Sequence, residues 1–214
     1  METTIYCLSG LGADHRVFSL LDVDADLVHI PWKKPLLNED PSEYMARISS
    51  GFEFKQPFYI LGLSFGGLML HHLMKLHSPQ GLILISTAKR RNDIPICWRF
   101  LLWTGLFSVL PLFMYKSPPP FVSAIFGVKN GDEKRMLKTI IRETDPHFSK
   151  WAIQVVQNWS PVSFQVPLIR IHGNKDKLLN VRKEKGTSIL NGGHLVIRSR
   201  AKAVSRLIND FVKK

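Results

Sequence analysis

Residues 58–67 constrain the fold of this chain more than any other segment. The apolar run Phe58-Tyr59-Ile60-Leu61 passes directly into Gly62-Leu63-Ser64-Phe65-Gly66-Gly67, and a helical stretch follows as far as Lys75. A strand joined to a helix through G-x-S-x-G is the nucleophile-elbow pattern, in which glycines are needed because flanking side chains would clash. The pattern predicts Ser64 at the tip of a tight turn, facing the free N–H groups of the helix. The alternative is a glycine-rich turn with an idle serine.

Apolar runs and helical stretches alternate along the chain. Short strands that are apolar throughout and separated by helices indicate a parallel sheet with helices on both faces. The predicted strands are Thr4–Leu8, Leu27–Ile30, Phe58–Leu61, Gly81–Ile85, Pro167–Ile171 and Ser188–Leu190. The predicted helices include one capped by Asp14 and running through Leu21, one opened by Pro41, one over Leu68–Lys75 and one over Ala201–Val212.

A long insertion, from about Lys89 to Ser163, separates the fourth and fifth predicted strands. We predict a core made of residues 1–88 and 164–214, with residues 89–163 forming a helical cap. Within the cap, the sequence predicts a break at Ser117-Pro118-Pro119-Pro120, a turn at Asn130-Gly131, and helices over Lys134–Ile141 and Phe148–Trp159.

Composition narrows the class of protein. A chain of 214 residues suits a single core, and two cysteines cannot form a disulfide framework. We expect Cys7 and Cys97 to be free thiols. Because residues 1–4 lead straight into a strand, without a basic and apolar leader, we expect no signal peptide and a cytoplasmic location.

Charge is the unusual property of the composition. The formal net charge is +12, but the basic residues are scattered and no nucleic-acid-binding motif accompanies them. We therefore expect a basic, solvated surface and no nucleic-acid partner. The apolar stretch Phe100–Tyr115 would span about 24 Å as a helix, too short to cross a bilayer, and Pro111 interrupts it. It is interpreted as part of the cap, and weak contact with a membrane surface is left open.

Two further polar residues follow predicted strands. Asp176 comes after the fifth strand and His194 after the sixth, behind Gly192-Gly193. Loops at one edge of a parallel sheet converge, so both can meet Ser64. A serine hydroxyl needs a general base, itself oriented by an acid, and the order Ser64, Asp176, His194 is the order of a Ser-Asp-His triad. His172 is the competing base and Asp93 the competing acid; Asp176 as a plain turn residue and His194 as a structural histidine are further alternatives.

An acyl-transfer site also requires two N–H donors for the developing oxyanion. The sequence predicts one at Phe65, directly after the serine. The second is expected in the loop Ser9-Gly10-Leu11-Gly12, at the N–H of Leu11, because the two glycines let that backbone approach closely.

These segments together resemble the α/β-hydrolase superfamily, and the chain is similar to its small, capped bacterial members over nearly its whole length. The segments that carry the resemblance are residues 9–12, 62–67, 171–176 and 192–194. It implies Ser64 as nucleophile, His194 as base, Asp176 as orienting acid, and Phe65 with Leu11 as oxyanion donors. Three features depart from the family pattern: Ser9 replaces the usual histidine before Gly10, the first two strands are missing, and the stretch between Asp176 and His194 is short.

The resemblance implies a serine hydrolase, and the apolar cap indicates an ester or thioester with a hydrophobic acyl or alkyl group. Cap residues expected to line the substrate site are Trp98, Trp103, Phe107 and Phe113. The alternative is that these side chains form the cap's own core. We expect no metal or cofactor, because no metal or nucleotide motif is present. A lyase or acyltransferase on the same scaffold, and a non-enzymatic ligand-binding member of the fold, remain the rival functions. The sequence does not indicate the oligomeric state.

Overall fold

A computed structural model describes residues 3–116, 122–128 and 131–213. The predicted break at residues 117–120 and the Asn130 side of the predicted turn lie outside these ranges. The strands form one six-stranded sheet in the order β2-β1-β3-β4-β5-β6, and every neighbouring pair is parallel. The strands are β1 (Thr4–Leu8), β2 (Asp26–His29), β3 (Phe58–Leu63), β4 (Gly81–Ile85), β5 (Leu168–Gly173) and β6 (Thr187–Leu190).

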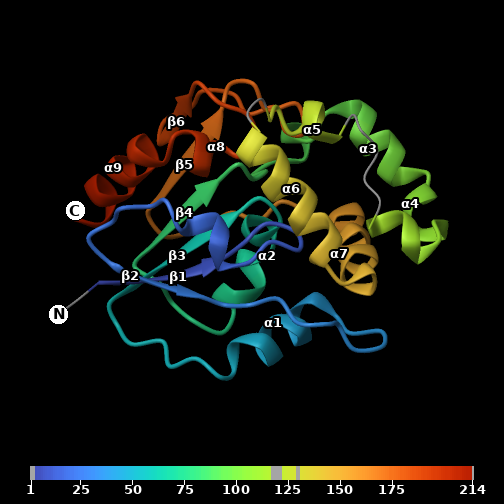
Figure 1. Cartoon of the computed structure of the whole chain (residues 1–214). Helices are drawn as coiled ribbons and strands as arrows, with labels where there is room; N and C mark the ends of the chain where they lie inside the picture. The colour runs from blue at the N-terminus through green and yellow to red at the C-terminus, as the bar shows by residue number, and fades with distance from the viewer. Residues whose placement is uncertain (1–2, 117–121, 129–130, 214) are drawn as a thin grey trace.

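Helices cover both faces of the sheet, as the apolar strands predicted (Figure 1). Alternation along β1 shows the division, because Tyr6 and Leu8 join one apolar cluster while Ile5 and Cys7 join the other. The first cluster is completed by α1 (Pro41–Ser49) and α2 (Phe65–Met74), and the second by the 3-10 helix η1 (His15–Phe18), α8 (Val196–Ser199) and α9 (Ala201–Val212). The sheet is therefore buried on both sides.

Local sequence explains where these helices begin. Pro41 is the first residue of α1, and Asp40 and Glu43 form a reciprocal capping box in front of it. Asp14 caps η1 as expected, but the predicted helix through Leu21 is wrong because η1 ends at Phe18. The backbone turns away there, and the N–H of Asp22 donates to Ser205 Oγ of α9 at 2.9 Å.

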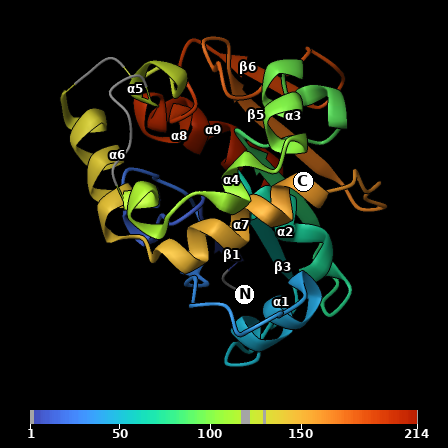
Figure 2. The ribbon, with the colours of Figure 1, turned by 90° about the vertical axis from the view of Figure 1, so that its right-hand side faces the viewer.

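The segment between β4 and β5 is helical. Its helices lie in the right-hand half of Figure 1, and in Figure 2 they spread across the side that faces the viewer. Its later helices enter the core, because Phe148 and Ala152 of α7 join the first cluster and Ile140 of α6 joins the second. The apolar stretch 100–115 is broken at Gly105, which has a left-handed backbone, and again before η3. Within the described ranges, no helix is both long and apolar enough to cross a membrane. The elements are η2 (Arg91–Asp93), α3 (Ile96–Trp103), α4 (Leu106–Val109), η3 (Leu112–Lys116), α5 (Val122–Ile125), α6 (Gly131–Glu143) and α7 (Pro146–Asn158).

Candidate active site

Ser64 occupies the turn between β3 and α2 in a backbone conformation that side-chain-bearing residues rarely adopt, with φ 52° and ψ −117°. Its N–H donates to the carbonyl of Ile85 at 2.9 Å, and its own carbonyl accepts from Thr87 Oγ1 at 2.7 Å. A Cβ on Gly66 would lie 2.3 Å from the carbonyl oxygen of Leu8, and one on Gly67 would lie 2.5 Å from the Thr87 side chain. The glycines are therefore needed for α2 to begin this close to β1 and β4.

The loops after β5 and β6 are tied together at the same edge of the sheet. The N–H of Lys175 donates to the carbonyl of Gly192 at 2.8 Å, and that of Asn174 to Leu190 at 2.9 Å. A Cβ on Gly173 would stand 2.3 Å from the carbonyl oxygens of both Gly192 and Gly193. This close approach of backbones brings the side chains that follow each strand into contact.

Ser64, His194 and Asp176 form a continuous chain of hydrogen bonds. His194 Nε2 lies 2.8 Å from Ser64 Oγ, and His194 Nδ1 lies 2.7 Å from Asp176 Oδ2. A carboxylate can only accept, so Nδ1 carries the ring proton and Nε2 is left to accept the serine hydroxyl proton. His194 is buried and Ser64 is only partly buried.

Asp176 is held as a carboxylate by four neighbours. Its Oδ1 accepts the N–H groups of Leu178 and Leu179 at 2.8 and 3.1 Å, which leaves Oδ2 for the histidines. Burial by itself raises the pKa of Asp176. The charge of His194 and the contacts with His172 and His194 outweigh burial and bring that pKa below its ordinary value. The group therefore stays a carboxylate at neutral pH and accepts a hydrogen bond from His194 Nδ1–H.

The competing residues have other positions. His172 Nε2 lies 2.9 Å from Asp176 Oδ2, off the direction of a good hydrogen bond, so it faces the acid rather than the serine. Asp93 is buried against Arg170, whose Nη2 is 2.8 Å from its Oδ2, and the same oxygen accepts the N–H of Lys89 at 2.8 Å. Asp93 thus anchors the loop after β4, and of the two candidate acids it is Asp176 that contacts His194.

The loop after β1 lies directly beside the serine. A Cβ on Gly10 would be 3.6 Å from Ser64 Cβ, and the carbonyl of Ser9 accepts the N–H of Gly66 at 3.1 Å. Within the described ranges, neither the N–H of Leu11 nor that of Phe65 donates a recorded backbone hydrogen bond. Leu11 lies in the loop after β1 and Phe65 is the first residue of α2, so both predicted oxyanion donors are next to Ser64.

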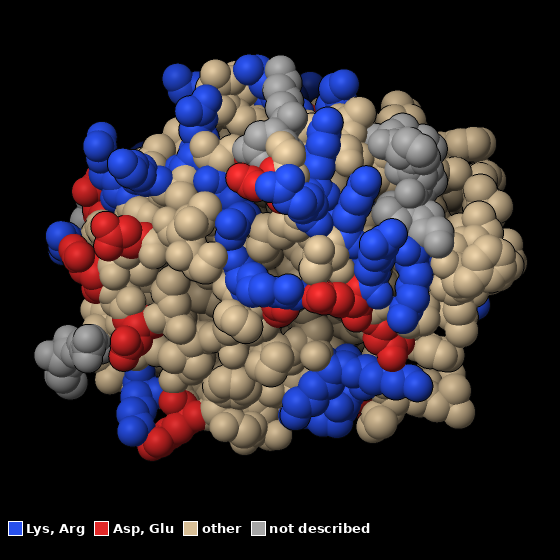
Figure 3. All heavy atoms as spheres, in the orientation of Figure 1, with Lys and Arg blue, Asp and Glu red and all other residues tan. Residues whose placement is uncertain are grey.

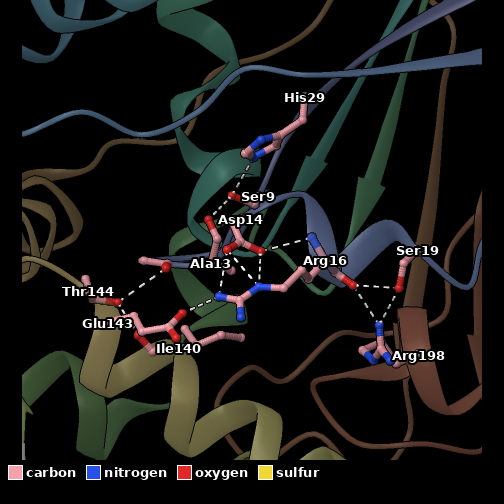
Figure 4. A network of polar contacts seen from close by, with 11 residues as sticks. Ser9, Ala13, Asp14, Arg16, Ser19, His29, Ile140, Glu143, Thr144 and Arg198 are labelled. Atoms are coloured by element: carbon pink, nitrogen blue, oxygen red, sulfur yellow. Dashed lines mark hydrogen bonds and ion pairs between the residues drawn. The ribbon is translucent and has the colours of Figure 1, made fainter.

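Ser9 takes part in a polar network behind this loop, which sequence reasoning did not anticipate (Figure 4). Its hydroxyl donates to the carbonyl of Ala13 at 2.5 Å, so it receives the Nε2–H of His29 at 3.2 Å. Trp32 Nε1 donates to the carbonyl of Gly10 at 3.0 Å. Side chains from the end of β2 and from the loop after it thus hold the loop after β1 in place.

The same loop is tied to the junction of α6 and α7. Thr144 Oγ1 is 3.3 Å from the carbonyl of Gly12, and a Cβ on Gly12 would overlap that threonine. Gly12 also has a φ of 68°, which favours glycine. Arg16 forms ion pairs with Asp14 and with Glu143, the last residue of α6, and so also links the loop after β1 to α6 (Figure 4).

Phe126 is a second residue that the sequence did not single out. Its carbonyl accepts the N–H of His194 at 2.8 Å, and its ring meets the imidazole edge to face, with centroids 5.1 Å apart and planes at 86°. A Cβ on the following Gly127 would be 2.7 Å from the carbonyl oxygen of Lys175 and 2.9 Å from Gly193 Cα. The turn after α5 therefore contacts the loops of both Asp176 and His194.

The four aromatic residues predicted to line the substrate site have different surroundings. Trp98 packs with Leu68 of α2 and with Trp159, and its Nε1 donates to the carbonyl of Lys177, next to Asp176, at 3.3 Å. Trp103 and Phe113 are largely exposed on α3 and η3, so they are not buried in a core of the cap. Phe107 is partly buried, and its carbonyl accepts the hydroxyl of Tyr115.

A cavity of about 260 Å³ opens beside the loop that carries Leu11. Its walls come from the loops after β1 and β2 and from the start of α7. The lining residues include Gly12, His29, Trp32, Lys33, Thr144 and Phe148. Phe148 also contacts the ring of Phe65 edge to face, which places this cavity next to the turn that carries Ser64.

Comparisons with known proteins identify the fold. No protein-family model and no curated protein sequence matches the chain. Solved structures do match over nearly the full length. A lipase-esterase related protein from Clostridium acetobutylicum has a TM-score of 0.71 at 17% identity, covering 98% of this chain and 94% of that one.

Two further structures are as similar. The enol-lactonase from Burkholderia xenovorans has a TM-score of 0.71 at 15% identity, and a hydrolase from Oleispira antarctica has 0.72 at 12%. Each alignment covers 100% of this chain and 92% of the other. At these identities the likeness is one of architecture. Together with the parallel sheet and the loops at its carboxyl edge, it shows that this chain has the α/β-hydrolase fold.

Proposed function

We propose that this chain is a serine hydrolase, which cleaves an ester or thioester with a hydrophobic acyl or alkyl group through an acyl-enzyme on Ser64. The observation that carries the proposal is the hydrogen-bonded chain from Ser64 Oγ through His194 to Asp176, with links of 2.8 and 2.7 Å. A serine hydroxyl gains nucleophilic strength only when a base within hydrogen-bond reach takes its proton, and this geometry supplies one.

In the first step, Ser64 Oγ attacks the carbonyl carbon of the substrate while its proton passes to His194 Nε2. The imidazolium that forms is stabilised by Asp176, whose Oδ2 holds Nδ1–H and whose Oδ1 is held in turn by two backbone N–H groups. Because the pKa of Asp176 is lowered, the proton remains on His194 and is available for the leaving group.

The negative charge of the tetrahedral intermediate falls on the former carbonyl oxygen. The N–H of Phe65, at the start of α2, and the N–H of Leu11 are the proposed donors to it. The network behind Ser9 and Gly12 holds the Leu11 loop in place before substrate binds, which lowers the reorganisation needed as charge develops. Collapse of the intermediate breaks the bond to the alcohol or thiol, which takes the proton from His194 Nε2.

A water molecule then hydrolyses the acyl-enzyme by the reverse sequence. His194 Nε2 takes a proton from the water as its oxygen attacks the acyl carbon, and then returns that proton to Ser64 Oγ as the acid leaves. One ester and one water are consumed, and one acid and one alcohol or thiol are released. No step requires an electron donor or acceptor.

The apolar surroundings support a hydrophobic substrate. Leu68, Ala88, Ile94 and Trp159 form a small apolar cluster beside α2, and Trp98 and Leu179 pack against it. Since Leu68 is one turn along α2 from Ser64 and Leu179 is three residues from Asp176, the cluster borders the reacting groups. We assign substrate selection to the insertion, residues 89–163, acting as a cap. The free thiols of Cys7 and Cys97 support a cytoplasmic location.

Hydrolysis of p-nitrophenyl esters over a series of acyl chain lengths tests the proposal. We expect turnover in the wild type, rising from acetate to longer chains, and a loss on the order of a million-fold in kcat for Ser64→Ala. Ser160→Ala, at an exposed serine, is the matched control and should keep full activity. An unchanged rate in Ser64→Ala would overturn the proposal. Release of a free acid, with water as acceptor, separates hydrolysis from acyl transfer.

A further inference from the structure

Seven large apolar side chains stand in solvent along the first half of the insertion. They are between 45% and 76% exposed, and they form what we call the apolar ridge: Ile96, Phe100, Trp103, Leu106, Val109, Phe113 and Met114. Isolated apolar residues on a surface are ordinary, but a succession of this size along three consecutive elements indicates a surface that meets another apolar phase.

Helix α3 presents one apolar face to solvent and packs another against the body of the protein. In α3, Ile96, Phe100 and Trp103 follow the spacing of one helical face and are exposed, with the rings of Phe100 and Trp103 6.0 Å apart. Trp98, on another face of the same helix, packs into the apolar cluster beside α2. Because Trp98 ties α3 to the body, the outward direction of the ridge is fixed by contacts within the protein.

The segment that carries the ridge has charges of one sign only. Residues 94–131 contain no Asp or Glu, and the charged residues of the 96–116 span are Arg99 and Lys116. Figure 1 places α3 and α4 at the right-hand edge of the molecule. In Figure 3 that edge is mostly tan, and the adjoining front surface carries many Lys and Arg side chains with some Asp and Glu among them. The whole chain carries a net charge of +12. Apolar side chains bordered by basic ones match a surface with acyl chains beneath negative headgroups.

We propose that the apolar ridge docks this protein on the surface of an anionic lipid bilayer. The aromatic and aliphatic side chains enter the boundary between headgroups and acyl chains, while Arg99, Lys116 and the net positive charge are attracted by the headgroups. Among the described residues, no helix is long and apolar enough to span the bilayer. The proposed contact is therefore with the surface of the bilayer.

Two other occupants are disfavoured by the same residues. If two copies met through their ridges, Arg99 and Lys116 of each would approach basic residues of the other, with no acid in residues 94–131 to pair with them. A nucleic acid would match the charge but would leave Ile96, Leu106 and Val109 without an apolar partner. An anionic bilayer satisfies both the apolar and the basic groups.

Docking would set α3 between the bilayer and the candidate active site, because the inner face of α3 reaches the carbonyl of Lys177 next to Asp176. A substrate with a long apolar chain would then be taken from the bilayer beside the site. The docking itself does not depend on catalysis, so Ser64→Ala should bind vesicles as well as the wild type does.

Vesicle co-sedimentation tests the proposal with the full chain. We expect the wild type to sediment with vesicles of equimolar phosphatidylglycerol and phosphatidylcholine, to bind phosphatidylcholine vesicles about tenfold more weakly, and to be released by high salt. The double variant Phe100→Ser/Trp103→Ser should lose about tenfold or more in affinity for the anionic vesicles. Leu37→Ser, at a side chain 92% exposed in the loop before α1, is the matched control and should bind as the wild type does.

Fluorescence gives a second readout at the ridge itself. Trp103 is 76% exposed, so its emission should shift to shorter wavelength on binding, and Trp103→Phe should abolish that shift while preserving sedimentation. Equal binding by the double variant and the wild type would overturn the proposal. Failure of the wild type to sediment with vesicles would also overturn it. The same holds if size-exclusion chromatography shows a dimer that the double variant converts to monomer, because a second copy would then cover the ridge.

Discussion

At the residue scale, Ser9 explains how the loop beside Ser64 is held without the histidine that usually precedes its glycine. The Ser9 hydroxyl donates to Ala13 and accepts from His29, so a small side chain joins two strand-end loops. A second proton on His29 would keep the Nε2–H donor but would place a charge in this partly buried network. Burial, followed by the nearby charge of His15, lowers the pKa of His29 from 6.5 to about 4.

The lowered pKa of His29 makes stability depend on pH in a defined window. Below pH 6.5 the unfolded chain protonates His29 while the folded chain does not, so the free energy of unfolding should fall as the pH drops from 6.5 towards 4. We expect this fall to be about 1–2 kcal/mol smaller in His29→Gln, which keeps an N–H donor. Urea unfolding of both proteins at pH 7 and pH 4.5 measures it. Equal losses in the two proteins would show that His29 is not the group responsible.

Asp176 and Asp93 are both buried carboxylates, but replacing the first should lower kcat whereas replacing the second should lower stability. Asp176→Asn removes the acceptor that fixes the tautomer of His194, and kcat should drop by about 10⁴-fold. Asp93→Asn removes the buried carboxylate paired with Arg170 and leaves the ion pair with Glu184, so it should lower the free energy of unfolding by about 3 kcal/mol with little effect on kcat at temperatures where it stays folded. Ester hydrolysis and thermal unfolding of the two variants, side by side, give the comparison. If Asp93→Asn were the catalytically impaired variant, the orienting acid would be misassigned.

At the element scale, the turn after α5 links the segment between β4 and β5 to the loops that carry Asp176 and His194. Phe126→Leu keeps the backbone carbonyl that accepts the N–H of His194 but removes the ring that meets the imidazole. We expect kcat to fall about tenfold with KM nearly unchanged, because a loosened imidazole affects the transition state more than substrate binding. Steady-state kinetics on one p-nitrophenyl ester measure this split.

Val122→Ala is the control for that variant. Val122 packs with Val128 and Leu137 in the same region. It should lower stability without the selective fall in kcat. If Phe126→Leu were as active as the wild type, the ring would have no positioning role. The same would follow if Phe126→Tyr, which keeps an aromatic ring, had a kcat as low as that of Phe126→Leu.

The sequence predicted those elements whose signals are local. The bounds of α9 and of β1 match the expected Ala201–Val212 and Thr4–Leu8, since apolar periodicity marks them. The start of α1 was marked by Pro41. The juxtaposition of Ser64, Asp176 and His194 followed from their places at strand ends, because a parallel sheet brings its carboxyl ends to one edge.

Contacts between segments distant in the chain were not predictable from one sequence. Phe126 and His194 are brought together by the turn after α5, and Gly12 meets Thr144 through the packing of α6 and α7. Neither pair has a periodic pattern or a motif. The outward direction of Trp103 and Phe113 likewise depended on where α3 and η3 are anchored, which composition does not reveal.

At the scale of the whole molecule, the insertion and the core share their apolar interior. Phe148 and Ala152 of α7 lie in one sheet-facing cluster, and Ile140 of α6 lies in the other. Residues 89–163 are an insertion in sequence, but their later helices should not be independently stable. We predict one cooperative transition in thermal unfolding, coincident by far-ultraviolet circular dichroism and by tryptophan fluorescence. Two separated transitions would contradict this and support a cap that folds as its own domain.

Covalent labelling by a fluorophosphonate tests the central claim most directly, because the reagent reacts only with a serine that its neighbours have activated. Mass spectrometry of the intact protein should show one adduct on the wild type, and peptide mapping should place it on Ser64. Ser64→Ala should remain unlabelled, and His194→Ala should react far more slowly. A wild-type protein that stays unlabelled, or an adduct on another residue, would contradict the proposal that Ser64, His194 and Asp176 act together as a nucleophilic site.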